Sequence, residues 1–85
     1  MYKVYVLYSK SSNRFYTGFT QNIERRLSEH NSGKTKSTKA FVPWKIVYVE
    51  EIESRIVARK REKYYKSGAG REKIKELLKE KLKDL

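Results

Sequence analysis

The sequence predicts a small α+β domain in which helices flank a three-stranded antiparallel sheet. Two stretches near the amino terminus are rich in aromatic and β-branched residues, and only a short turn separates them, as in a hairpin. A similar stretch follows in the middle of the chain. Three further segments have the apolar spacing of helices. The chain of 85 residues has room for one domain, residues 1–85, with the expected element order ββαβαα.

The expected hairpin pairs residues 2–8 with residues 14–19 through a serine-rich turn. A two-residue turn places Tyr5 opposite Gly18 and diagonal to Tyr16. Because side chains alternate along a strand, these three residues share one face of the sheet. Gly18 has no side chain and would therefore leave open space beside the two phenols.

The first helix is expected over residues 22–31, with Thr20 or Asn22 as its N-terminal cap. Ile23 and Leu27 form its inward-facing apolar stripe. The rest of the chain is expected to form a lysine-rich loop, a strand and two helices over residues 33–43, 44–50, 55–66 and 71–84.

The two last helices have recognisable boundaries. Ser54 can cap the first of them, and Gly68-Ala69-Gly70 is expected to break the chain between them. The apolar side of the last helix consists of Ile74, Leu77, Leu78, Leu82 and Leu85. The strand alternation predicts a common core of Val4, Val6, Phe15, Ile23, Trp44, Val47 and Val49.

The charge of the chain indicates a polyanionic partner. Its 21 Lys and Arg residues outnumber its 10 Asp and Glu residues, for a formal net charge of +11. Solubility alone is the alternative explanation. A membrane-surface role is disfavoured, since acidic residues nearly balance the lysines of the last helix. The chain has no apolar run of membrane length and no recognisable signal peptide, so we expect a cytoplasmic location.

The residue types also restrict the kind of metal site. The chain has no cysteine and a single histidine, His30, so zinc sites built from thiolates or several imidazoles are excluded. A metal ion would have to bind to carboxylate and water oxygens, which favours Mg²⁺ or Mn²⁺.

Several short motifs follow one another along the chain. They are Lys3-Val4-Tyr5, Tyr16-Thr17-Gly18, a stretch over 23–33 with Arg26 and His30 four residues apart, and Ala58-Arg59-Lys60-Arg61-Glu62. Each alone has an ordinary structural explanation as a strand former or a solvated helix residue. Together, in this order and spacing, they make residues 2–66 resemble the GIY-YIG endonuclease family. The first motif keeps only the tyrosine, and Thr17 stands where the second has isoleucine. The resemblance is closest to small stand-alone bacterial members of the UPF0213 type.

This resemblance implies a divalent-metal-dependent endonuclease that hydrolyses phosphodiester bonds. In the family's pattern Tyr5, Tyr16, Arg26 and His30 would be catalytic, and Glu62 would bind the metal ion. Tyr5 would be the general base, and Tyr16 would orient the water or the phosphate. Arg26 would bind phosphate oxygens through its planar, permanently charged guanidinium group. His30 would position a phosphate or relay a proton. With one glutamate, Mg²⁺ or Mn²⁺ would need water and substrate phosphate to complete its shell.

DNA is the expected partner. Because the sequence shows no recognition helix, zinc finger or RNA-binding sheet motif, we expect recognition by structure and not by base sequence. The expected phosphate-binding residues are Lys34, Lys36, Lys39, Arg59, Lys60, Arg61, Lys63 and Lys66. A protein partner could supply further specificity. The main alternative is a non-catalytic nucleic-acid-binding module that kept the same fold. A ribosome-associated basic protein would explain the charge but not the spacing of the tyrosines.

Overall fold

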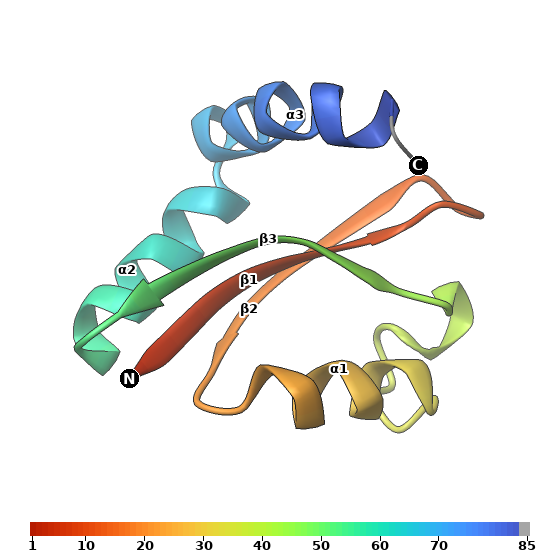
Figure 1. Ribbon diagram of the computed structural model, residues 1–85, viewed down its shortest axis with the longest axis horizontal. Helices are drawn as coiled ribbons and strands as arrows, with labels where there is room; N and C mark the ends of the chain where they lie inside the picture. Colours follow the sequence, from red (N-terminus) through yellow and green to blue (C-terminus); the bar gives the residue numbers. More distant parts are fainter. Residues whose placement is uncertain (84–85) are drawn as a thin grey trace.

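The computed structural model describes residues 1–83, with side chains described as far as residue 79. Its elements are β1 (Tyr2–Ser9), β2 (Arg14–Thr20), α1 (Ile23–Asn31), a short 3₁₀ helix (Lys39–Phe41), β3 (Lys45–Ile52), α2 (Arg55–Lys66) and α3 (Gly68–Lys83). The strands form one antiparallel sheet in the order β2-β1-β3 (Figure 1). The predicted fold class and the order ββαβαα are confirmed.

The hairpin has the register predicted for a two-residue turn, although four turn residues, 10–13, lie between its last paired residues, Ser9 and Arg14. Tyr5 lies opposite Gly18 and Leu7 lies opposite Tyr16, so the tyrosine pair and the glycine lie on one face. Strand β1 is the central strand and bonds to a neighbour on both edges. Because both of its faces are covered, four consecutive residues from Val4 to Leu7 are buried.

The predicted single core is wrong, because the sheet has a separate core on each face. Helices α2 and α3 cover one face, and α1 covers the other (Figure 1). The α2–α3 face buries Val4, Val6, Val47, Ala58, Tyr65, Ile74 and Leu78, with Phe15 packed at its margin. The α1 face buries Tyr5, Leu7, Ile23 and Trp44, with Leu27 only partly buried. The predicted core residues are therefore divided between the two faces.

Val49 was predicted to lie in the core, but its side chain is 38% exposed. The pairing of β3 with β1 shifts by one residue at Val47, between the pairs Val6–Tyr48 and Leu7–Ile46. This bulge places two consecutive residues, Val47 and Tyr48, against the α2–α3 core. Val49, opposite Tyr5, lies on the other face and outside its core cluster.

The first two helices begin at the predicted caps. The Asn22 side chain accepts a hydrogen bond from Arg25 N, and the Ser54 hydroxyl accepts one from Val57 N. Of the two predicted caps for α1, Asn22 is therefore the one used. Thr20 instead accepts a hydrogen bond from the Asn22 backbone N–H.

The predicted break at residues 68–70 is displaced, because α3 already begins at Gly68. Ser67 ends α2 in an extended conformation, and its hydroxyl then accepts a hydrogen bond from Gly70 N. Gly70 serves close packing, since a Cβ there would collide with the carbonyl group of Tyr64.

The predicted apolar side of the last helix is only partly buried. Ile74 and Leu78 are in the core, but Leu77 is 41% exposed. The same prediction included Leu82 and Leu85, which lie outside the residues whose side chains are described. No helix within the described part of the chain is long and apolar enough to cross a bilayer.

Candidate active site

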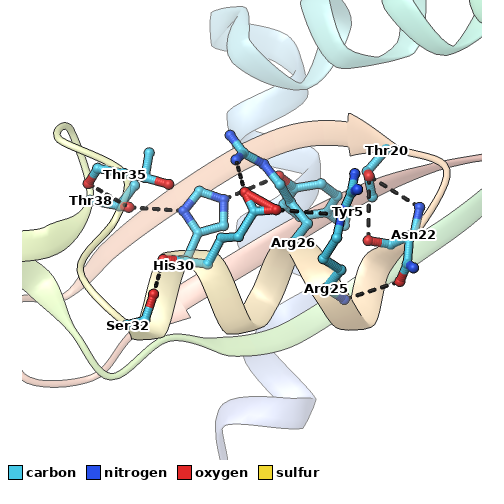
Figure 2. A network of polar contacts seen from close by, with 10 residues as sticks. Tyr5, Thr20, Asn22, Arg25, Arg26, His30, Ser32, Thr35 and Thr38 are labelled. Atoms are coloured by element: carbon cyan, nitrogen blue, oxygen red, sulfur yellow. Dashed lines mark hydrogen bonds and ion pairs between the residues drawn. The ribbon is translucent and has the colours of Figure 1, made fainter.

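Tyr5 and His30 meet on the α1 face of the sheet. The Tyr5 hydroxyl lies 3.2 Å from His30 Nε2, and His30 Nδ1 lies 2.8 Å from Thr38 Oγ1 (Figure 2). All three side chains are buried, with exposed fractions of 2% or less. Strand β1, helix α1 and the loop after α1 therefore contribute one residue each to a continuous buried chain of hydrogen bonds.

The hydrogen-bond partners assign the direction of this chain. The positive charge of Arg26 acts on the Tyr5 oxygen and partly offsets the rise in the pKa of Tyr5, so the Tyr5 proton is directed away from the guanidinium and toward another acceptor. Within the described residues that acceptor is His30 Nε2. His30 Nδ1 then carries the ring proton and donates it to Thr38 Oγ1, whose own proton points to the Thr35 carbonyl oxygen at 3.4 Å.

Tyr16 and Gly18 complete the aromatic part of the site. The Tyr16 ring centroid lies 4.7 Å from that of His30 and 6.3 Å from that of Tyr5. A Cβ on Gly18 would lie 2.7 Å from the Tyr5 hydroxyl oxygen and 3.2 Å from Tyr16 Cε1. The two phenols therefore occupy the space that any larger residue at position 18 would need.

Arg26 reaches this cluster from α1. Burial lowers the pKa of Arg26, but interaction with the Tyr5 and Tyr16 hydroxyls more than compensates and raises it overall. Its Nη1 also lies 3.1 Å from Glu29 Oε2, one turn further along the helix. Glu29 thus holds the guanidinium beside the two phenols.

The electrostatics of the site keep both members of the central pair neutral near pH 7. Burial raises the pKa of Tyr5 to about 12, with the nearby Arg26 opposing this shift. Burial and then the charge of Arg26 hold the pKa of His30 below its usual range, against the opposing charge of Glu29. A neutral imidazole with a free Nε2 lone pair therefore faces a protonated phenol.

Glu62 on α2 is a second acidic residue that acts on this site, in addition to Glu29. Its negative charge contributes to the raised pKa of Tyr5, so it lies within electrostatic reach of the phenol. Its side chain is 21% exposed, and its Oε1 lies 3.7 Å from Lys66 Nζ. This long, partly exposed ion pair is weak, so the carboxylate can exchange Lys66 for another cation.

The donor set fits one kind of metal site. Among the described side chains, no group of three or more His, Asp or Glu residues is arranged to hold an ion. A single partly exposed carboxylate suits Mg²⁺ or Mn²⁺, because these ions keep several waters and take substrate phosphate oxygens as ligands. Glu62 is thus compatible with an open site of this type.

Residues 1–75 match the family of the GIY-YIG catalytic domain. The chain belongs to the GIY-YIG family. It is 45% identical over 73 residues to a UPF0213 protein of Syntrophus aciditrophicus, with 84% of this chain and 83% of the relative covered. It is 41% identical over 80 residues to a UPF0213 protein of Limosilactobacillus reuteri, with 91% and 82% covered.

A solved structure supports the same assignment. The solution NMR structure of the UPF0213 protein BH0048 from Bacillus halodurans is 32% identical in sequence and superposes with a TM-score of 0.55. The match covers 91% of this chain and 85% of that protein. The predicted family and its small UPF0213 branch are thus confirmed. Membership of the GIY-YIG family implies a nuclease domain.

Arg61 has a structural partner in this GIY-YIG domain. Its guanidinium forms two hydrogen bonds with Glu50, at 3.0 and 2.7 Å, and one with the Tyr65 hydroxyl at 2.6 Å. The hydroxyls of Tyr48 and Tyr65 donate to the same carboxylate. This network holds α2 against β3. Because the Arg61 guanidinium is engaged in it, we do not propose Arg61 as a phosphate-binding residue.

The other predicted basic residues are exposed and open to a ligand. They are Lys34, Lys36 and Lys39 in the loop after α1, and Arg59, Lys60, Lys63 and Lys66 on α2. The loop also carries Thr38, so the same segment supplies lysines and a buried partner for His30.

Two residues of the site were missed by the sequence reasoning. Glu29 could have been found, because it lies three residues after Arg26 on the same helix face. Thr38 could not, because it stands in a loop without periodicity and is one of several threonines and serines there.

Proposed function

We propose that this GIY-YIG domain is a divalent-metal-dependent endonuclease that cuts DNA and prefers branched or distorted structures over particular sequences. The convergence of Tyr5, Tyr16, Arg26 and His30 on one side of the sheet, within reach of Glu62, carries the proposal. A protein that only bound nucleic acid would gain nothing from a buried phenol–imidazole pair beside a carboxylate.

The hydrogen-bond chain suits proton transfer during hydrolysis. The attacking water would lose its proton to the Tyr5 hydroxyl oxygen while the Tyr5 proton moves to His30 Nε2. The water oxygen forms the new bond to phosphorus, and the bond to the departing nucleotide oxygen breaks. That oxygen takes a proton from solvent, and His30 returns its extra proton through Tyr5 to solvent. Since Tyr5 never needs to be a free phenolate, its high pKa is compatible with the reaction. Thr38 acts as a positioning residue, because it keeps the proton of neutral His30 on Nδ1.

Arg26 would stabilise the charge that grows on the phosphate oxygens, since it is permanently charged and held by Glu29. Glu62 would hold Mg²⁺ or Mn²⁺. A bound ion of this kind supplies Lewis acidity at the phosphate and neutralises the leaving oxygen. Exposed lysines and arginines around the site would bind neighbouring phosphates without reading bases.

The test compares single-turnover cleavage by the parent and three variants, Glu62→Gln, Arg26→Ala and Tyr5→Phe. The substrates are duplex, single-stranded and branched DNA, and RNA, each with Mg²⁺, Mn²⁺ or EDTA. We expect cleavage of branched DNA with a metal ion. Glu62→Gln should lower the rate by orders of magnitude while folding and DNA binding remain. Arg26→Ala should lower it in a way that extra Mg²⁺ does not restore.

The control is Glu53→Gln, which neutralises an exposed carboxylate outside the site and should cut like the parent. Equal cleavage by Glu62→Gln and the parent would show that the metal ligand is wrongly assigned. If a clean parent preparation binds but cuts none of these substrates with either ion, the domain is a non-catalytic binding module.

A further inference from the structure

A basic groove of about 580 Å³ runs along the outer edge of β2, and we call it the β2-edge groove. Within residues 1–83, strand β2 pairs with β1 alone, so its other edge is free to form the floor. The loop after α1 contributes Phe41 and Thr38 from one face of the sheet, and α2 and α3 contribute Lys66, Arg71 and Lys75 from the other. The groove thus wraps round the edge of the sheet.

The lining has a single sign of charge. Among the residues whose side chains are described, it contains the four cations Arg14, Lys66, Arg71 and Lys75 and no acidic residue. All four are exposed. Arg71 and Lys75 are four residues apart on α3, and therefore neighbours on the same side of that helix. A groove lined this way attracts phosphate groups from both of its walls.

The groove also offers aromatic surface. Phe41 and Tyr16 contribute to its lining, and the Arg14 guanidinium lies 4.4 Å from the Phe41 ring centroid. Cations that follow a backbone, interleaved with rings on which bases can stack, are the usual features of single-strand binding. A duplex exposes neither its base faces nor a single backbone to such a groove.

The groove is continuous with the candidate active site. Tyr16 lines the groove and also packs against the His30 ring. Thr38 lines it and hydrogen-bonds to the same histidine. Lys66 lines it and pairs with Glu62. A strand lying in the groove would therefore lead directly to the residues proposed to cut it.

We propose that the β2-edge groove holds a single-stranded segment of the nucleic-acid substrate adjacent to the scissile phosphate. This inference rests on the proposed function and adds to it the part of the substrate that is recognised. It explains why branched or frayed DNA would be preferred, since such structures provide a single strand next to a duplex.

The test measures binding in EDTA, where cleavage plays no part, by fluorescence anisotropy with a labelled single-stranded oligonucleotide and with the matching duplex. The groove variant carries Arg14→Gln, Arg71→Gln and Lys75→Gln. The control variant carries Lys45→Gln, Lys73→Gln and Lys79→Gln, which remove the same charge at exposed positions outside the groove.

We expect the groove variant to bind the single strand at least tenfold more weakly than the control variant. The slope of log affinity against log salt concentration should become shallower by about two units, because three phosphate contacts are lost and each contributes roughly 0.7 for a single strand. A second variant, Phe41→Leu, keeps an apolar side chain against Trp44 but removes the stacking face. It should weaken single-strand binding by about fivefold or more at normal thermal stability.

Equal loss of affinity in the groove and control variants would overturn the proposal, because net charge alone would then explain binding. A groove variant that loses duplex binding but keeps single-strand binding would overturn it as well. The proposed function can fail separately. A parent that binds single strands through the groove but never cuts would leave the groove in place and refute the nuclease.

Discussion

Gly18→Ala tests the packing of the candidate site without any assay of activity. The added Cβ would lie 2.7 Å from the Tyr5 hydroxyl oxygen, 2.9 Å from Tyr5 Cζ and 3.2 Å from Tyr16 Cε1. The backbone of Gly18 is not in the left-handed region, so steric contact is the only reason for glycine here. Tyr5 cannot easily move away, because it is 1% exposed and hydrogen-bonded to His30.

Two effects of opposite sign determine the magnitude. Replacing glycine by alanine inside a strand ordinarily stabilises a protein by roughly 0.5–1 kcal/mol. Overpacking a well-filled site costs about 1–3 kcal/mol. The clash should win, and we expect a net loss of about 1–2 kcal/mol in the free energy of unfolding. Displacement of the Tyr5 hydroxyl should also lower the rate of any cleavage.

Urea denaturation followed by circular dichroism measures the stability change. Gly68→Ala is the matched control, because a Cβ there meets nothing within 4 Å, and it should be neutral or stabilising. In a Tyr5→Phe background, Gly18→Ala should cost less stability, because the Tyr5 hydroxyl oxygen at 2.7 Å is absent. The cost should not vanish, because ring atom Cζ remains at 2.9 Å. A Gly18→Ala variant that is more stable than the parent would refute the packing described for the two phenols.

Four further predictions concern the same domain. Thr38→Val should lower the free energy of unfolding by about 1–3 kcal/mol, because it leaves His30 Nδ1–H buried and unpaired. It should also change the His30 tautomer seen in ¹⁵N spectra. Thr38→Ser keeps the hydroxyl and should retain both the stability and the tautomer of the parent. Hydrogen bonds from Arg61, and to a smaller extent from the Tyr65 and Tyr48 hydroxyls, lower the pKa of Glu50 from 4.5 to about 2. The ionised Glu50 therefore contributes its full stabilisation above pH 4.5, and this stabilisation is lost as the pH falls toward 2. Acid titration over that range should lower Tm more in the parent than in Glu50→Gln, and equal slopes would contradict the ion-pair network. Leu27→Ala should cost less than the roughly 2–5 kcal/mol of a fully buried leucine, because Leu27 is only partly buried, and a loss within or above that range in urea would contradict the observed packing. Affinity for duplex DNA should fall with salt by several units of log–log slope, and a flat response would exclude the electrostatic basis of binding.

The elements that follow simple periodicities were predictable from the sequence. The period of two in the hairpin predicts that Tyr5 faces Gly18, and the caps Asn22 and Ser54 predict where α1 and α2 begin. The bulge at Val47 was not predictable, because one extra residue in a strand leaves no local signal, and it reverses the expected burial of Val49.

The candidate site shows the same division. The family resemblance predicts that Tyr5 and His30 belong to one site, and in the structure the Tyr5 hydroxyl lies 3.2 Å from His30 Nε2. The partner of His30 comes from a loop, where no periodicity indicates which hydroxyl is buried. The start of α3 was misplaced because Gly70 was interpreted as a helix breaker, whereas it allows close approach to the Tyr64 backbone.

The central position of β1 has a consequence for how this domain can evolve and move. Tyr5 stands on the strand that is bonded along both edges and covered on both faces, so its backbone amide should exchange with solvent only when the whole domain opens. The surrounding groups come from the neighbouring strand β2, from one helix on each side of the sheet and from a loop. New substrate preferences can therefore arise by changing these surroundings around a fixed phenol, whereas a change of Tyr5 itself would remove the hydroxyl at the centre of the site.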